Sequence, residues 1–474
     1  MLFRAFLVLC LLTSPVFSAD AAAPAKSVTH HTGVFDGKSI SYRAVVEQTI
    51  LPDAGGKPAA SMVTTAYIRD GVANENHRPV MFVFNGGPGA SSSPLHMHAF
   101  GPKRLIAGDN GSVLADNPHS ILDTTDLVFI DPIGTGLSRP LPGVDGQPFW
   151  TVTGDADSVA AFIRTWLKEN HREASPHFLC GESYGASRAA QIVHAAPDVK
   201  LDGVLLLSMV GTPGDSDLPF VLMFPSFATT AAFHGVVDAA GRTPQQIFED
   251  AVHFARTDYV SALIQGDALP PEEKQKMAAR MSTMMGLPAD FIAAHNLRVT
   301  KYDFVLALLK SRGLTIGQID TRVTGSIAEF VGQKPPHDDP SMAGSKKGRS
   351  DSELIQDYLT KDLGFATAET YRSLNLDINA KWKFDADAFG SPARVIGESL
   401  QTRLNTRVFW SGGLYDFATP IYGGIYTLDH SGIPADRLTV ARFPTGHMVY
   451  EGDENLARFT DAVRGFVNGS KSTP

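Results

Sequence analysis

The sequence predicts an α/β fold with a doubly wound, mostly parallel sheet, interrupted by a large and mainly helical insertion. Two observations lead to this fold class. Short, fully apolar runs bounded by Gly, Pro or Ser are typical of parallel strands that are covered on both faces. An amphipathic helical pattern over 159–167 stands between two of these runs. The runs lie at 79–84, 126–130, 177–180 and 204–207.

The same alternation returns near the end of the chain. Apolar runs at 407–410 and 438–443 are followed by a helical pattern over 454–467. Strands that alternate with helices indicate βαβ units. We therefore expect the last part of the chain to complete the sheet that the first part begins.

The middle of the chain has a different character. Helix formers dominate it, with helical patterns over 270–286 and 303–309, and strand-like runs are few. We expect core segments at 24–213 and 401–474, and an insertion at 214–400. Four methionines form a partial stripe, for which core packing is the first interpretation and a substrate-lining wall the alternative: Met277, Met281, Met284 and Met285. The charged, proline-containing stretch 334–353 predicts an exposed loop.

Composition limits the classes of function. The chain has 474 residues, of which 43% are hydrophobic and 19% charged, and this is ample to build a large core. Fifty acidic residues against 41 basic ones give a formal net charge of −9. A nucleic-acid-binding domain carries a basic patch or stripe. We therefore expect no nucleic-acid partner.

The first residues predict an export signal. Arg4 precedes a short apolar stretch, and small residues follow it. We expect residues 1–18 to be removed, with cleavage as late as residue 23, and no membrane attachment afterwards, because the stretch is too short to span a bilayer. Cys10 would leave with the signal, so Cys180 would be the only thiol and no internal disulfide could form. An exported chain without disulfides favours a bacterial periplasmic or secreted protein.

The segment 181–185 (GESYG) has the G-x-S-x-G pattern of a nucleophile elbow. An apolar run precedes it and a helix-compatible stretch follows it. The sharp turn needs flanking glycines and leaves the serine hydroxyl exposed above the sheet. This context predicts that Ser183 is a nucleophile in an α/β-hydrolase fold.

A serine nucleophile needs a base and an acid that orients the base. In this fold they follow the serine in the order acid, then histidine. Asp416 follows the apolar run 407–410, and His447 follows the run 438–443. The sequence predicts the triad Ser183, Asp416 and His447, and the long stretch between Ser183 and Asp416 accommodates the insertion.

An oxyanion hole is expected from the amide of the residue after the nucleophile and from an earlier strand–helix loop. Tyr184 provides the first amide, and Gly87 in the glycine-rich segment 85–89 is the candidate for the second. Two other motifs are weaker. The segment 134–136 lacks the third glycine of a dinucleotide site. The histidines at 96 and 98 lack further residues that would complete a metal site. We expect no metal and no organic cofactor.

Five segments together resemble the serine carboxypeptidases, peptidase family S10. They match in content and order across residues 80–470, whereas the insertion matches only in position and size. They are NGGPGASSS at 85–93, DPIGTGLS at 131–138, GESYG at 181–185, SGGLYDFATP at 411–420 and GHMVYEGDE at 446–454.

The resemblance implies further roles. It implies that Asn85, the Gly86 amide and Glu182 bind the free C-terminal carboxylate of a peptide. In that family the glutamate must be protonated to donate its hydrogen bond, which makes chemical sense because an ionised Glu182 would repel the substrate anion. Many relatives place a second glutamate against the first, but Ala99 holds that position here. We therefore expect Glu182 to ionise more readily than in the two-glutamate relatives.

The sequence as a whole predicts a serine-type carboxypeptidase that acts on peptides with a free C-terminus through an acyl-enzyme. Two alternatives stay open. The same triad could serve an esterase or acyltransferase, and the fold could serve a non-catalytic binding protein.

Overall fold

The computed structural model describes residues 25–108, 110–210, 216–343, 348–386 and 391–469. The predicted export signal lies outside these residues. The strands are β1 (Lys26–Phe35), β2 (Lys38–Pro52), β3 (Pro58–Arg69), β4 (Val80–Phe84), β5 (Lys103–Gly108), β6 (Gly111–Asp116), β7 (Asp126–Ile130), β8 (Arg139–Pro140), β9 (His177–Glu182), β10 (Gly203–Leu207), β11 (Leu314–Ile316), β12 (Thr324–Ser326), β13 (Arg407–Gly413) and β14 (Leu438–Phe443).

The α-helices follow the same chain order. They are α1 (Val152–Glu169), α2 (Tyr184–Ala195), α3 (Leu218–Phe233), α4 (Pro244–Phe254), α5 (Val260–Gln265), α6 (Pro271–Met285), α7 (Ala289–Ala294), α8 (Lys301–Ala307), α9 (Ile327–Phe330), α10 (Asp351–Asp357), α11 (Leu376–Lys381), α12 (Pro392–Ser399), α13 (Ile421–Asp429) and α14 (Asp453–Val467). A π-helix, η2, spans Leu95–Phe100.

The main sheet has the order β1-β2-β3-β7-β4-β9-β10-β13-β14, and β8 pairs with β3. From β7 to β14 all neighbours are parallel, which confirms the predicted parallel sheet. β1, β2 and β3 extend the sheet through antiparallel pairing. The apolar-run criterion missed these three strands for two reasons. β1 and β2 alternate in exposure along part of their length, and β3, although buried, contains Ser and Thr residues that interrupt its apolar run.

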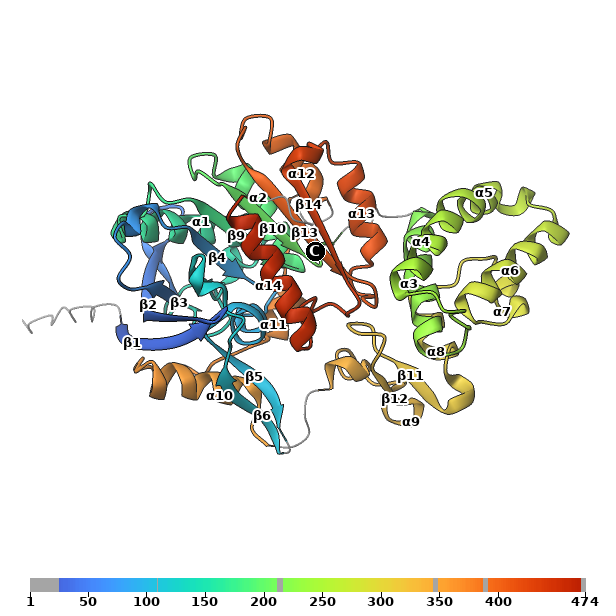
Figure 1. The fold of residues 1–474 in the computed structure, drawn as a ribbon, viewed down its shortest axis with the longest axis horizontal. Helices are drawn as coiled ribbons and strands as arrows, with labels where there is room; N and C mark the ends of the chain where they lie inside the picture. Colours follow the sequence, from blue (N-terminus) through green and yellow to red (C-terminus); the bar gives the residue numbers. More distant parts are fainter. Residues whose placement is uncertain (1–24, 109, 211–215, 344–347, 387–390, 470–474) are drawn as a thin grey trace, which may run out of the picture.

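Helices cover both faces of the sheet (Figure 1). Successive side chains of a strand point to opposite faces, so Phe82 packs in a hydrophobic cluster with α1, α2 and α12. Its neighbours Met81 and Val83 pack instead with η2 and α14. The parallel strands from β7 to β13 are therefore buried on both sides, as their apolar runs require, whereas the edge strand β14 is only partly buried.

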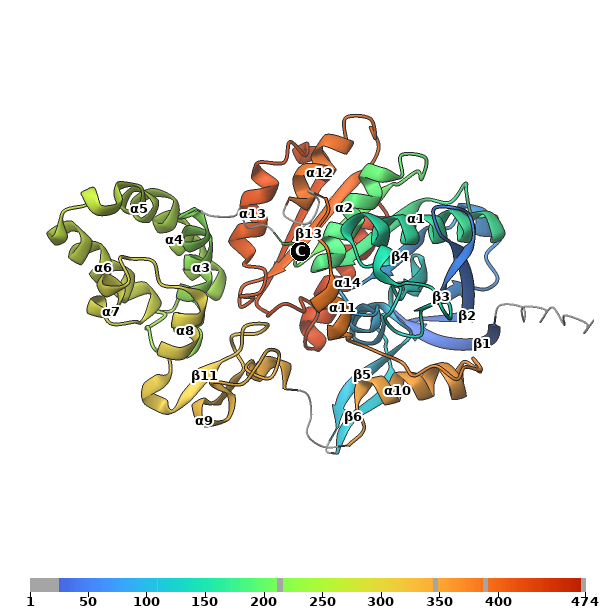
Figure 2. The same cartoon turned by 180° about the vertical axis from the view of Figure 1, so that it is seen from behind.

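The helices α3–α8 form a separate layer beside the sheet, which both views show (Figures 1 and 2). They have their own hydrophobic cluster, in which Met281 and Met285 are buried and Met277 and Met284 are partly buried. The core-packing interpretation of the methionine stripe is confirmed. Later parts of the expected insertion pack elsewhere, since α10 joins the cluster under η2 and α12 joins the cluster under α1. The expected boundaries at 214 and 400 stay a prediction.

Among the described residues, no helix combines the length and the apolar character that crossing a bilayer requires.

Candidate active site

The nucleophile elbow has the backbone that the motif predicts. Ser183 stands between β9 and α2 with a φ of +59°, a left-handed conformation that non-glycine residues rarely adopt. A side chain on Gly181 would collide with the backbone of Gly185, so the turn closes only because Gly181 has no side chain. Ser183 is partly exposed, whereas Glu182 and Tyr184 are buried. The serine is thus presented at the end of a buried strand.

The predicted acid and base lie in direct contact. His447 Nδ1 lies 2.8 Å from Asp416 Oδ2, and the Asp416 side chain is fully buried. The other oxygen, Oδ1, accepts the amides of Ala418 (2.8 Å) and Thr419 (3.0 Å). The Thr419 hydroxyl donates to Oδ2 at 2.5 Å. These bonds fix the carboxylate so that it faces the imidazole.

The charge state of His447 follows from this contact. Burial alone lowers the pKa of His447, but the charge of Asp416 and the hydrogen bond to it outweigh burial, and Glu182 adds to them. Together they raise the pKa of His447 to about 9. With Nδ1 directed at Asp416, Nε2 is the nitrogen left for proton transfer with a nucleophile.

The elbow and the histidine loop meet at the end of β10. The Ser183 amide donates to the Leu207 carbonyl at 2.9 Å. The hydroxyl of the next residue, Ser208, donates to the His447 carbonyl at 2.6 Å. Two consecutive residues at one strand end therefore hold the turn of Ser183 and the loop of His447, two segments that lie far apart in the sequence.

The glycine-rich loop after β4 lies against the elbow. A side chain on Gly86 would collide with the Tyr184 amide nitrogen, so the two predicted backbone regions touch. Gly87 has a φ of +98°, and a Cβ there would lie 2.8 Å from the Ala90 amide. The loop therefore needs glycine at both positions. The assignment of the Gly87 and Tyr184 amides to an oxyanion hole stays a prediction.

Glu182 and Asn85 form a buried polar pair beside this loop. Asn85 Nδ2 donates to Glu182 Oε1 at 2.7 Å. Burial raises the pKa of Glu182 to about 7, although the charge of His447 and the nearby Tyr450 and Asn85 side chains act in the opposite direction. Glu182 therefore holds its proton to higher pH than an exposed glutamate, although no second glutamate stands at position 99.

The expectation that Glu182 ionises more readily than in the two-glutamate relatives stays a prediction. Ala99 is fully buried near the end of η2, and its carbonyl accepts the Asn117 side-chain amide at 2.9 Å. A second carboxyl, the only source of a raised pKa that the motifs suggested, is absent here. Burial alone also raises the pKa of a carboxyl group. Whether one carboxyl is buried depends on tertiary packing, which a sequence motif does not specify.

Tyr450 is a site residue that the motifs did not reveal. It lies next to Glu182 and stays uncharged, because burial and the Glu182 charge lift the pKa of its hydroxyl well above the ordinary value. Within the described part of the chain, neither Glu182 Oε2 nor the Tyr450 hydroxyl has a hydrogen-bond partner of good geometry. The available signal was the position of Tyr450 in the segment 446–454, three residues after His447.

Arg188, which the motifs did not reveal, bonds to the backbone of the glycine-rich loop. The buried Arg188 on α2 donates to the Asn85 carbonyl at 2.5 Å and to the Asp155 carboxylate at 2.6 Å. Arg188 thereby ties the loop to α1 and α2. The helical pattern over 159–167 could not predict this ion pair, because Asp155 and Arg188 meet only when α1 and α2 pack together.

One of the two histidines weighed as metal ligands, His96, has contacts that explain its presence in the core. His96 is buried, lies 2.7 Å from the Tyr67 hydroxyl and stacks on Phe129. Burial lowers the pKa of His96 to about 3. No group of three or more His, Cys, Asp or Glu side chains suited to a metal ion occurs among the described residues.

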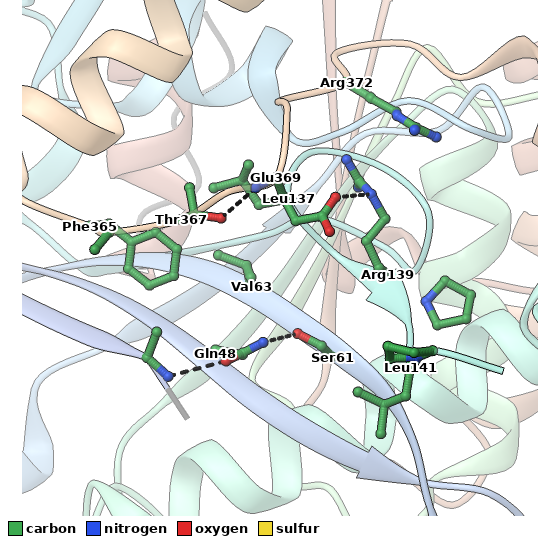
Figure 3. A pocket seen from close by; sticks show the side chains of 14 residues that line it. Gln48, Ser61, Val63, Leu137, Arg139, Leu141, Phe365, Thr367, Glu369 and Arg372 are labelled. Atoms are coloured by element: carbon green, nitrogen blue, oxygen red, sulfur yellow. Dashed lines mark hydrogen bonds and ion pairs between the residues drawn. The ribbon is translucent and has the colours of Figure 1, made fainter. Parts of the chain in front are cut away.

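A separate hollow of about 420 Å³ lies between the β2–β3 region and the stretch 365–372 (Figure 3). None of the predicted catalytic residues lines it. Its polar groups bind one another: Gln48 donates to Ser61 at 2.6 Å, and Arg139 pairs with Glu369 at 3.0 Å. The hollow is therefore distinct from the candidate active site.

Comparisons with known proteins agree with the resemblance seen in the motifs. The family model described as serine carboxypeptidase matches residues 67–200, which include the glycine-rich loop and the elbow. Serine carboxypeptidase-like 35 of Arabidopsis thaliana is 29% identical over 127 residues, which are 26% of each chain. Serine carboxypeptidase S10 family member 2 of Dictyostelium discoideum is 34% identical over 119 residues, 24% of this chain and 20% of the relative. The matched stretch thus spans about a quarter of these relatives or less.

The likeness in fold extends over nearly the whole chain. Kex1(Δ)p, a prohormone-processing carboxypeptidase from Saccharomyces cerevisiae, superposes with a TM-score of 0.57 and covers 90% of both chains at 15% identity. At this identity the likeness establishes the shared α/β-hydrolase fold. Together with the match to the curated relatives, these findings give one conclusion. Residues 67–200 match the serine carboxypeptidase family, peptidase family S10, and the chain as a whole has the α/β-hydrolase fold.

Proposed function

We propose that this protein is a serine-type carboxypeptidase that releases the last residue of peptides with a free C-terminus. The observation that carries the proposal is the 2.8 Å contact between His447 and Asp416. It supplies an oriented base on the same sheet edge as the strained Ser183. A triad arranged in this way activates a serine hydroxyl for acyl transfer.

In the proposed mechanism Ser183 Oγ attacks the carbonyl carbon of the last peptide bond while Nε2 of the neutral form of His447 takes the hydroxyl proton; the protonated form, which the pKa of about 9 favours at lower pH, cannot act as this base. The amides of Gly87 and Tyr184 would stabilise the negative charge that develops on the carbonyl oxygen. His447 then gives its proton to the leaving amine, and the C–N bond breaks. Water attacks the resulting ester with His447 again as base, which releases the shortened peptide and restores Ser183.

The polar pair of Asn85 and Glu182 favours a carboxypeptidase over an esterase. A neutral carboxyl beside an amide donor provides hydrogen bonds for a substrate carboxylate, and the raised pKa of Glu182, about 7, keeps that carboxyl neutral in acid. An esterase that accepts uncharged substrates has no need of such a pair. We assign Asn85, the Gly86 amide and Glu182 to binding of the substrate carboxylate.

The test is a panel of N-blocked dipeptides with free or amidated C-termini, assayed in the acid and neutral ranges. We expect cleavage of the free acids and a large loss on amidation. Equal rates on free and amidated substrates would favour the esterase or acyltransferase alternative. Failure of a fluorophosphonate probe to label Ser183 in the native chain would favour the non-catalytic alternative.

We further propose that the protein is exported to a bacterial periplasm or secreted. The support is the leader-like composition of residues 1–23 and the single thiol expected in the mature chain.

A further inference from the structure

A short segment of the expected insertion bonds directly to both loops of the acid–base pair. This bridging segment, residues 317–322, connects β11 to β12, which lie below the helical layer in Figure 1. Its Gln318 carbonyl accepts the Phe417 amide at 2.9 Å, and its Ile319 carbonyl accepts the His447 amide at 2.8 Å. The Thr321 amide donates to the Tyr415 carbonyl at 3.0 Å. The bridging segment therefore holds the residues on both sides of Asp416 and the base itself.

The contact between the bridging segment and the histidine loop is close. A Cβ on Gly446 would lie 2.6 Å from the Ile319 carbonyl oxygen and from Asp320 Cβ. Glycine before the histidine is therefore needed for this approach. Arg322 reinforces it, since its guanidinium donates to the Pro444 carbonyl at 3.1 Å and also contacts Glu451.

Asp339 holds the other side of the bridging segment. Its carboxylate accepts the amides of Gln318 at 3.1 Å and Ile319 at 3.2 Å, and the amide and hydroxyl of Ser341 at 2.9 and 2.5 Å. The Ser341 hydroxyl in turn accepts the Asp320 amide at 3.2 Å. Asp339 is only 6% exposed. The stretch that the sequence predicted to be an exposed loop thus turns inward at this residue.

These contacts give the bridging segment two faces. Three consecutive amides face Asp339 and its partner Ser341, and the carbonyls of Gln318 and Ile319 face the loops of Asp416 and His447. A buried carboxylate that satisfies several backbone amides fixes their geometry, because each unpaired amide would cost free energy. A displacement of about 1 Å at a catalytic group is enough to reduce turnover strongly.

We propose that Asp339 is a positioning residue that sets the geometry of the Asp416–His447 pair through the bridging segment 317–322. This inference rests on the proposed function only for its effect on catalysis. Its effect on the acid–base pair itself does not depend on which substrate is hydrolysed.

The test compares Asp339→Asn with Asp338→Asn in the full chain. The asparagine at 339 would direct an NH2 group, which cannot accept, at backbone amides. Asp338 is the adjacent aspartate, it is partly exposed, and its side chain makes no hydrogen bond or ion pair with the described residues. We expect kcat per fluorophosphonate-titrated site to fall about 10- to 100-fold in Asp339→Asn, with little change in KM, because Asn85 and Glu182 lie on other loops. Asp338→Asn should behave as the unchanged protein.

A readout that is independent of activity is the titration of His447, followed by NMR of labelled imidazole nitrogens. Asp416 and Glu182 are the charged groups that raise the pKa of His447, and Asp416 is the larger cause. Loosening the Asp416–His447 contact in Asp339→Asn should therefore lower that pKa, and Asp338→Asn should leave it in place. A partial loss of folded protein would change neither the pKa nor kcat per titrated site.

If Asp339→Asn does not fold, Ser341→Ala replaces it, since that variant removes only the hydroxyl between Asp339 and the Asp320 amide. A smaller fall in kcat, with a lower pKa of His447, is then expected. The inference is wrong if the folded variants have the same pKa of His447 and the same kcat per titrated site as Asp338→Asn. Activity that survives Ser183→Ala would instead overturn the proposed function, and the His447 titration would still decide whether Asp339 positions the pair.

Discussion

Asn85 Nδ2 donates a hydrogen bond of 2.7 Å to Glu182 Oε1, which links the loop after β4 to the residue immediately before Ser183. Glu182 is the residue on which the proposed specificity for a free C-terminus depends, and it lies in contact with the loop that would bind that carboxylate. Its protonation state therefore connects substrate binding to pH.

The first prediction concerns KM and pH. Glu182, with a pKa of about 7, is neutral in acid and ionised above that pH. The ionised form repels a substrate carboxylate, so KM should rise with pH above the pKa, by about tenfold per unit at the limit of one titrating proton. Glu182→Gln should flatten this rise, because an amide donates at any pH. Glu169→Gln, a change at the end of α1 and away from the site, is the matched control.

The measurement is a pH–KM profile for one N-blocked dipeptide acid. A profile of Glu182→Gln that overlays the profile of Glu169→Gln would refute the role of Glu182 in binding. The substitution should also lower the pKa of His447, because the Glu182 charge is one of the groups that raise it.

The second prediction concerns stability. The pKa of Glu182 is about 7 in the folded chain and returns to its ordinary value of 4.5 on unfolding. Below pH 4.5 the carboxyl is protonated in both the folded and the unfolded chain, so its ionisation does not affect the free energy of unfolding. Between pH 4.5 and about 7 only the unfolded state releases the proton, so stability falls as pH rises. The loss should level off above the folded-state pKa at about 3 kcal/mol.

Glu182→Gln removes this titration. The melting temperature of Glu182→Gln minus that of the unchanged protein should therefore be larger at about pH 8 than at about pH 5. For Glu169→Gln this difference should be the same at both pH values. Scanning calorimetry at the two pH values measures both. A difference for Glu182→Gln that does not change with pH would mean that the carboxyl is solvated in the folded protein.

The third prediction concerns the triad. Ser183→Ala and His447→Ala should each lower kcat by about 10⁴-fold or more, and the double variant should be no worse than either, because the two groups act as a unit. Asp416→Asn should lower kcat by about 10⁴-fold, since an amide facing Nδ1 favours the wrong imidazole tautomer. Melting temperatures verify that each variant folds. Substantial peptidase activity in Ser183→Ala would exclude the proposed mechanism.

The fourth prediction concerns export. The intact mass of the protein recovered from the periplasm or medium should show loss of about the first 18 to 23 residues. Thiol titration should then find one group, Cys180, which is buried and free, and whose pKa burial raises. It should react only after denaturation, and Cys180→Ser should show no thiol. A retained Cys10, with a lipid attached to it, would contradict the proposal.

Local patterns of residue types were sufficient to predict several elements of this protein. Apolar runs marked β4, β7, β9, β10 and β13, because strands buried on both faces have no polar side to display. The edge strand β14, which is only partly buried, was found from its alternation with helices. The elbow around Ser183 was equally visible, since the turn demands glycines at fixed positions next to the serine. Asp416 and His447 could be predicted as acid and base because each follows an apolar run, in the order that this fold requires.

Features that join distant segments of the chain could not be predicted in this way and became visible in the folded structure. The criterion of continuous apolar runs did not detect the antiparallel strands β1–β3. The helices α10 and α12 pack on the sheet, although they fall within the expected insertion. The burial that raises the pKa of Glu182 and the attachment of Asp339 to the His447 loop through the segment 317–322 have no sequence signature. Burial and long-range backbone hydrogen bonds depend on which surfaces pack together, and a local pattern of residue types does not specify that packing.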